Sequence, residues 1–238
     1  MRRIAILLLL ALPAPASATT LADLRAEART LALDNGTRLR FSTATIDNWL
    51  NEAQSIANLE MRLIRKSREF DLSAGTTFYS LPSDFLQLLR VTFKYRALGE
   101  PTSEALAGKV GWNWIEAKGQ PTSYYINFAS RTLIAFYPWP DTSSSTGTIR
   151  YEYWAQTTDM VLAADTPFNG ITELQPYANA LPVAAAVNMV RIDGRMDLVI
   201  LYDNEWDQWM ARIKAEANNR PNYRPGMQPG TPLIRTGP

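Results

Sequence analysis

Apolar residues recur at helical spacing in the first third of the chain. A short run covers 21–33, and a longer one begins after Phe41 and Ser42. Spacings of three and four residues place these side chains on one face of a helix. The pattern predicts helices over 21–33 and from about Thr45 to Arg68. The second helix is expected to bury Ile46, Trp49, Leu50, Ala53, Ile56, Ala57, Leu63 and Ile64.

Hydroxyl residues stand where both predicted helices begin. Thr20 precedes the first helix, and Ser42 or Thr43 can cap the second by accepting a hydrogen bond from a first-turn amide. Phe41, just before that cap, can pack back onto Ile46. Asn35-Gly36 is expected to end the first helix, because glycine tolerates the left-handed conformation.

From Phe70 to about Gln156 the chain consists of short aromatic and β-branched segments separated by prolines. This composition is typical of strands. Along 148–154, Ile149, Tyr151 and Tyr153 alternate with polar or larger residues, as in a half-exposed strand. The phrase over 81–85 is expected to form a turn or a short helix. The predicted strands cover 76–80, 89–95, 123–128, 132–137 and 148–154.

Helical spacing returns after Pro167. One helix is expected from near Pro176 to Ile192, and Pro182 should kink it or restart it because proline lacks the amide hydrogen. Asp193-Gly194 is the predicted turn. The last helix, over 196–218, carries an apolar stripe made of Val199, Tyr202, Trp206, Trp209, Met210 and Ile213.

The first eighteen residues admit two interpretations. Arg2 and Arg3 precede an apolar run over 4–12, and Ala16-Ser17-Ala18 offers small residues for cleavage, as in a secretory signal peptide. The run is too short to span a membrane as a helix. The alternative is an apolar arm that packs on a neighbouring subunit.

The last twenty residues, 219–238, are rich in proline and glycine and contain arginines but no acid. Such a segment buries too little apolar surface to fold alone. It is either a disordered tail or an arm that becomes ordered on a partner. In the second case the contacts would come from Arg220, Tyr223, Arg224, Met227, Leu233, Ile234 and Arg235.

The composition excludes several kinds of chemistry. Twenty-four lysines and arginines balance 23 acids, so the chain is not a polycation that would coat nucleic acid. Without cysteine or histidine it has no thiolate ligand, no disulfide and no histidine-based catalytic triad. A carboxylate pair remains conceivable, Asp84 with Asp159 or Glu104 with Glu116. We expect no enzyme activity, no catalytic residue, no cofactor and no metal site.

Three clusters of residues can be interpreted either as binding sites or as ordinary structural features. Trp112-Asn113-Trp114 can contact carbohydrate or protein, or it can plug a sheet edge. Phe93-Lys94-Tyr95-Arg96 can stack single-stranded nucleic acid, or it can form one core face and one wet face of a strand. The basic run of Arg62, Arg65, Lys66 and Arg68 suits the negative end of a helix dipole, or forms a patch that faces a subunit or DNA.

Four sequence segments follow the first predicted helix, over 40–54, 74–86, 119–125 and 133–140. The order and the residues of these segments, within roughly 20–217, resemble those of the portal-to-tail adaptor (head completion) proteins of tailed bacteriophages. Proteins of that family usually carry an unbroken helix where this chain has Pro182. This departure bears on the packing angle of that helix.

The resemblance implies a structural protein of the phage neck, assembled in the host cytoplasm and located in the virion. It implies a homo-oligomeric ring of about twelve copies that binds the portal protein and a tail or nozzle protein. Packaged DNA would pass through without sequence specificity, and no membrane would be involved. The basic run would face the portal or the DNA, and the C-terminal arm would reach the portal. The alternative is a secreted or periplasmic non-catalytic binding protein, cleaved after Ala18.

The expected fold class is α+β. N- and C-terminal helices over 19–69 and 172–218 would form one bundle, with a small antiparallel β-domain over 70–171 inserted between them. Residues 1–18 and 219–238 would be terminal segments outside both.

Overall fold

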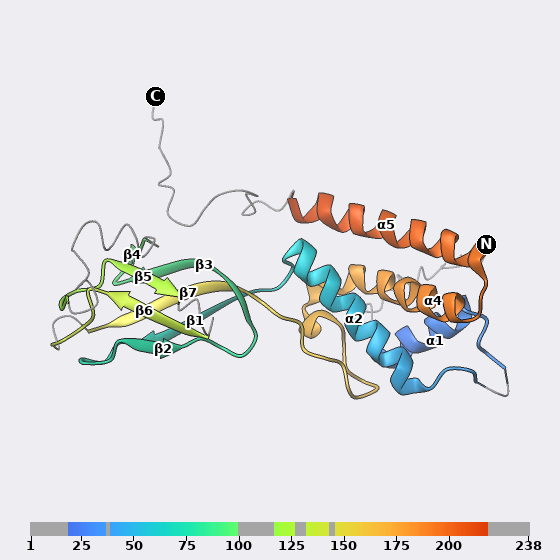
Figure 1. Cartoon of the computed structure of the whole chain (residues 1–238), viewed down its shortest axis with the longest axis horizontal. Helices are drawn as coiled ribbons and strands as arrows, with labels where there is room; N and C mark the ends of the chain where they lie inside the picture. The colour runs from blue at the N-terminus through green and yellow to red at the C-terminus, as the bar shows by residue number, and fades with distance from the viewer. Residues whose placement is uncertain (1–18, 37–38, 100–116, 127–131, 143–145, 219–238) are drawn as a thin grey trace, which may run out of the picture.

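The computed structural model describes residues 19–36, 39–99, 117–126, 132–142 and 146–218. It has mixed α+β secondary structure, with all sheet pairings between named strands antiparallel, which confirms the expected class. Figure 1 shows the helices at one end of an elongated molecule and the strands at the other. The predicted roles of both terminal segments, of Trp112-Asn113-Trp114 and of the Glu104–Glu116 pair fall outside the described residues.

Two helices precede the strands and two follow them. They are α1 (Leu21–Leu31), α2 (Thr43–Met61), α4 (Leu181–Ile192) and α5 (Met196–Asn218). Two 3-10 segments, η2 (Phe168–Gly170) and η3 (Thr172–Ala180), lead into α4. Helix α4 contacts α1, α2 and α5, and it is apolar on nearly every side because it lies among them.

The predicted starts of the first two helices are confirmed. Thr20 and Asp23 form a reciprocal capping box on α1, and the Thr20 hydrogen bonds lower the pKa of Asp23. Ser42 caps α2 by accepting from Thr45 N at 3.1 Å. The Phe41 ring meets the Trp49 ring edge to face, with centroids 5.7 Å apart.

The predicted helix ends need correction. Helix α1 ends at Leu31, and Leu33 rather than Asn35-Gly36 takes the left-handed conformation, with φ of 55°. Helix α2 ends at Met61 instead of near Arg68, because Arg62 is left-handed, with φ of 50°. Residues Arg65–Asp71 then form strand β1. The stripe prediction also fails at Ile56, which is exposed.

Strands form two sheets that pack through aromatic rings. The first sheet has the order β1-β7-β3-β4, with β3 (Phe85–Phe93), β4 (Arg96–Ala97) and β7 (Thr148–Ala155). The second has the order β2-β6-β5, with β2 (Phe78–Ser80), β5 (Ser123–Ile126) and β6 (Leu133–Tyr137). Phe70 of β1 stacks on Tyr79 of β2 at 5.0 Å between centroids, which joins the sheets.

The five predicted strands exist with shifted bounds, whereas β1 and β4 were not predicted. The alternation in β7 is confirmed, since Ile149, Tyr151 and Tyr153 are buried. Residues 81–85 form a turn, closed by Phe85 N donating to Pro82 O at 3.1 Å. Pro182 lies in the first turn of α4 and restarts the helix after η3, as one of the two expected outcomes. Around Pro176 the chain is 3-10 and not α-helical.

Three amide side chains on one face of α2 hold the connection that returns from the strands. Asn51 bonds both backbone groups of Met160, at 2.8 and 3.1 Å. Gln54 donates to Thr158 O and accepts from Phe168 N, each at 3.1 Å. Asn58 donates to Ala155 O at 2.8 Å. Because Gln54 and Asn58 are fully buried, these bonds fix residues 155–168 against α2.

Candidate interaction surfaces

The predicted basic run does not lie on one helix face. Arg62 caps α2, while Arg65, Lys66 and Arg68 alternate along β1 and so point to opposite faces of the sheet. Arg65 forms an ion pair with Glu152, and Lys66 Nζ lies 2.6 Å from Asp84 Oδ2. Two of the four charges are therefore compensated within the chain, which weakens the case for a cationic patch at this place.

Asp84, one of the candidate catalytic acids, is a structural ion-pair partner. Burial raises its pKa, but hydrogen bonds from Lys66 and from Tyr153, the latter at 3.1 Å, outweigh burial and lower it. A general acid needs the opposite shift. Asp159, its proposed companion, is exposed. Asp84 therefore has the environment of a stabilising carboxylate rather than that of a proton donor.

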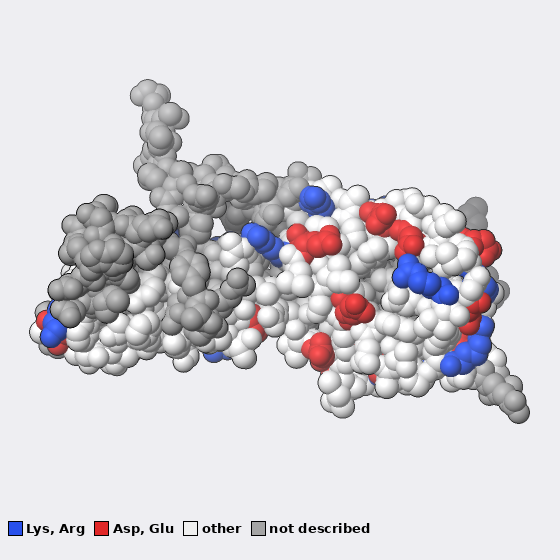
Figure 2. All heavy atoms as spheres, viewed as in Figure 1, with Lys and Arg blue, Asp and Glu red and all other residues white. Residues whose placement is uncertain are grey.

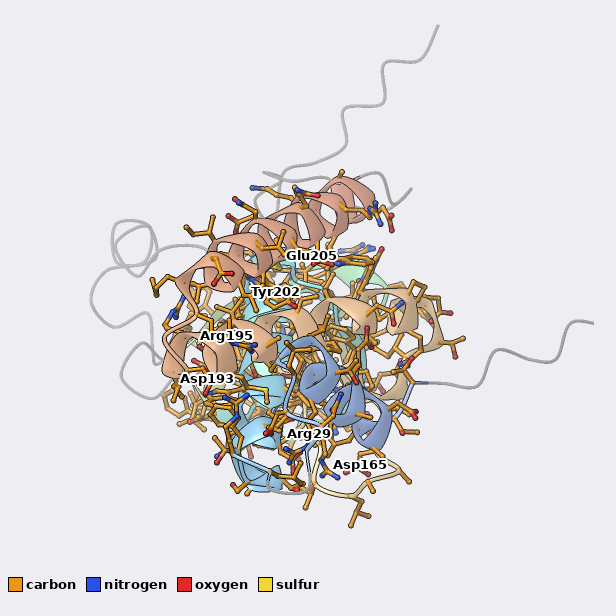
Figure 3. All side chains as sticks on the ribbon, turned by 90° about the vertical axis from the view of Figure 1, so that its right-hand side faces the viewer. Arg29, Asp165, Asp193, Arg195, Tyr202 and Glu205 are labelled. Carbon is orange, nitrogen blue, oxygen red and sulfur yellow. The ribbon has the colours of Figure 1, made fainter. Side chains whose placement is uncertain are left out.

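A chain of charged side chains closes the end of the helical region that lies away from the strands. Asp34, 1 % exposed, has Arg29 Nη1 at 2.5 Å and accepts from Arg40 N at 2.9 Å. Arg40 continues to Asp193 at 2.5 Å, and Arg195 lies 3.9 Å from the same carboxylate. Figure 3 looks onto this end, where Arg29, Asp193 and Arg195 are labelled. The network ties the α1–α2 connection to the α4–α5 turn.

Exposed aliphatic side chains surround this network. Leu39 and Ile192 each precede one member of the Arg40–Asp193 ion pair. Leu33 and Met196 each follow one partner of the hydrogen bond that Arg195 donates to Ala32 O. Ile200 follows Met196 one helical turn later on α5. We call this set the apolar end face: Leu33, Leu39, Ile192, Met196 and Ile200, each 55–68 % exposed. Grouped exposed apolar residues of this kind mark protein interaction sites.

A second exposed feature is the tip of the β3–β4 hairpin. Lys94 and Tyr95 form its two-residue turn, with φ of 46° and 66°, and Tyr95 is fully exposed at 102 %. In the segment Phe93-Lys94-Tyr95-Arg96 only Phe93 is buried. The expected division into a core side and a wet side therefore holds, although the turn rather than strand alternation exposes Tyr95.

A shallow depression lies on the outer side of α5. Its volume is about 740 Å³, and its described lining residues are Leu201, Asn204, Glu205, Asp207, Gln208 and Ala211. We call it the α5 depression. Figure 2 shows several acidic side chains over α5 on the face in view. The sequence did not predict this depression, because the apolar stripe over 196–218 identifies only the buried side of the helix.

The described part of the chain contains neither a metal-binding cluster nor a helix suited to span a membrane. No three histidine, cysteine or acidic side chains gather there as metal ligands would. None of the helices within the described ranges combines the length and the apolar character that crossing a bilayer demands. The C-terminal residues predicted to contact a partner, Arg220 to Arg235, lie outside the residues that the structure describes.

Comparison with known proteins gives one result on the family. The model of a family described as SU10 adaptor protein matches residues 19–230, which is most of the chain. No curated protein matches the sequence. The match spans the helices, both sheets, the apolar end face and the α5 depression. The chain therefore belongs to the SU10 adaptor protein family, a family of phage head-tail adaptors.

Proposed function

We propose that this protein is a non-catalytic adaptor in the neck of a phage, where it joins the portal to the tail. Family membership supports a structural role in the virion. The observation that carries the proposal is the apolar end face, because five exposed apolar side chains next to an ion-pair network suit a protein partner and not a small substrate.

In the assembled neck we propose a closed ring of about twelve copies, which would help to retain the packaged genome and let it pass. Head-to-tail contacts between identical subunits close into such a ring when the rotation between neighbours divides a full turn. The helical region would supply most subunit contacts. The arm residues from Arg220 to Arg235 would reach the portal, with Arg62 and Arg68 facing a subunit or the DNA.

We further propose that residues 19–69 and 172–218 act as one helical bundle, with 70–171 as an inserted β-domain. Support comes from α4, which contacts α1 and α2 from before the strands and α5 from after them. In this arrangement the bundle carries the apolar end face and the insertion carries the hairpin. The terminal segments 1–18 and 219–238 would remain available for contacts with neighbours.

The test measures binding of the full chain to its cognate portal by sedimentation and native mass. The double variant Met196→Asp and Ile200→Asp places charges on the apolar end face without replacing a member of the ionic network. We expect it to fold as the wild type does and to lose portal-dependent assembly at least about tenfold. Val161→Asn with Leu162→Asn, exposed in the loop between β7 and η2, is the control. It makes two apolar residues polar without adding negative charge beside Asp165, which accepts from both amides, and it should assemble normally.

If the end-face variant assembled on the portal as well as the wild type does, the proposed role of that face would be refuted. A wild-type chain that stays monomeric and has no affinity for the portal would refute the adaptor. The alternative, an exported binding protein, would instead appear in a periplasmic or culture fraction, cleaved after Ala18.

A further inference from the structure

The β3–β4 hairpin presents an exposed aromatic tip. Phe93, 1 % exposed, anchors its base, and Lys94 Nζ lies 5.0 Å from the centre of the Phe93 ring. Gly147 packs so closely that a β-carbon there would come within 2.9 Å of Lys94 Cε and 3.1 Å of Phe93 Cε2. The packed base of the hairpin therefore holds the Tyr95 side chain out in solvent, where it is available to another molecule.

The conformation of the turn is unfavourable for the residues that occupy it. Two-residue hairpins with positive φ at both positions favour asparagine and glycine, whereas this one has lysine and tyrosine. A large aromatic side chain with 102 % exposure gains nothing from the fold of its own chain. Strain and exposure at the same residue indicate that Tyr95 has its contact in another molecule.

The hairpin is also cationic. Arg90, Lys94 and Arg96 lie on it, and the segment 90–97 has no acid. Nucleic acid is a poor candidate partner, because single-strand binding uses several stacking rings and Tyr95 is the one exposed ring of the motif. Glu69 and Glu152 also line the same hollow as Tyr95 and offset part of the charge of Arg90, Lys94 and Arg150 there. A protein surface with a recess and carboxylates fits the hairpin better.

The α5 depression has that chemistry. Leu201 offers apolar contact for a ring at one end and Ala211 at the other, about 15 Å away along the helix. Asn204 and Gln208 offer partners for a hydroxyl, and Glu205 and Asp207 offer negative charge. Neither acid has an ion-pair partner among the described residues. Burial raises the pKa of Glu27 on α1, and the nearby Glu205 charge raises it further, so Glu205 lies within electrostatic reach of α1.

We infer that the hairpin tip of one subunit docks into the α5 depression of a neighbouring copy, with Tyr95 in the recess and Arg96 and Lys94 against Glu205 and Asp207. This contact rests on the ring proposed above and gives it a specific subunit interface. Because the two surfaces lie on different parts of an elongated molecule (Figure 1), the contact joins unlike surfaces of neighbouring copies, which is the head-to-tail kind that can close into a ring.

The chain has no cysteine, so engineered cysteines can test the contact without background. Ala97→Cys on the hairpin and Ala211→Cys in the depression are exposed positions beside the proposed anchors. We expect a short bismaleimide to link this pair into a ladder of oligomers when the full chain is assembled on its portal. The control pair, Ala97→Cys with Leu162→Cys, should give no ladder.

Charge reversal provides a second, independent test. Lys94→Glu with Arg96→Glu should lower the fraction of chain in rings at least about tenfold, and adding Glu205→Arg with Asp207→Arg should restore it to within about threefold. Tyr95→Ala and Tyr95→Gly should both impair assembly, while Tyr95→Phe retains it. Glycine suits the positive φ, so loss of assembly in Tyr95→Gly cannot be attributed to misfolding.

Rings of normal mass without the specific cross-linked ladder would overturn this contact and leave the adaptor role intact. A charge reversal on the hairpin that the reversal on α5 does not rescue would do the same. Absence of any wild-type ring on the portal would overturn the contact together with the proposed function.

Discussion

At the scale of single residues, the most demanding position is Asp34. Its carboxylate is 1 % exposed and is compensated by Arg29, itself only 12 % exposed. Replacing one member of a buried ion pair leaves the other charge unpaired in a poorly solvated place. We therefore expect Asp34→Asn to lower the free energy of unfolding by about 3–5 kcal/mol, measured by urea denaturation.

The matched control for Asp34 is Asp203→Asn. Asp203 lies 3.4 Å from Arg191, and both side chains are about half exposed. An exposed pair is screened by water, so this change should cost less than about 1 kcal/mol. Equal costs for the two variants would show that the network around Asp34 does not hold the end of the helical region.

Asp84 gives the protein a predictable acid sensitivity. Although burial raises its pKa, hydrogen bonds from Lys66 and Tyr153 lower it overall. A depressed folded pKa adds stability above the unfolded value of about 3.9, and this stability is lost as pH falls through the folded value. Unfolding free energies measured from about pH 6 to pH 3 should fall less steeply in Asp84→Asn than in the wild type.

Lys66→Met is the companion variant for that experiment. It keeps the apolar stem of the side chain but removes the ammonium that bonds Asp84. Its stability should depend on pH less than that of the wild type and more than that of Asp84→Asn, because Tyr153 still donates to the carboxylate. Identical pH profiles for all three proteins would contradict this role of Asp84.

At the scale of elements, one side chain decides where α2 ends. Asn58 Oδ1 accepts from Leu63 N at 3.2 Å and Ile64 N at 3.1 Å, and Nδ2 donates to Ala155 O. It thereby satisfies amides that would otherwise be orphaned at the exit from the helix. We expect Asn58→Ala to leave buried backbone groups unpaired and to cost about 3 kcal/mol or more in urea denaturation.

Asn204→Ala, on the exposed side of α5, is the control for Asn58. It should change the free energy of unfolding by no more than about 0.5 kcal/mol. If Asn58→Ala were as mild as Asn204→Ala, the connection between α2 and β1 would not depend on the amide.

Local signals in the sequence were sufficient for some elements. Thr20, Ser42 and the alternation over 149–153 act through neighbours within a few residues, so the caps and β7 were predictable. Strand β1 was not predictable in this way. Residues 62–68 continue an apparent helical pattern, and they form a strand because Asn58 ends the helix and β7 offers seven backbone partners.

At the scale of the whole molecule, the class and the family were accessible from the sequence, whereas the surfaces were not. The apolar end face joins Leu33 and Leu39 to Ile192 and Met196, which more than 150 positions separate and which only the folded chain brings together. The exposure of Tyr95 depends likewise on a turn conformation that its sequence does not favour.

The whole-molecule account predicts that both surfaces are covered in the virion. The end face would contact another neck protein, and the hairpin tip would meet the α5 depression of the next subunit. An elongated subunit with separate surfaces on its helices and its sheets suits a connector that must bind several neighbours at once.

The most direct measurement is the intact mass and copy number of this chain in purified virions. The account predicts a full-length chain from Met1 at about twelve copies per particle, released together with the portal and tail. Absence from virions, with a chain that begins at Thr19 in a periplasmic or culture fraction, would contradict it and would indicate an exported protein that shares the adaptor fold.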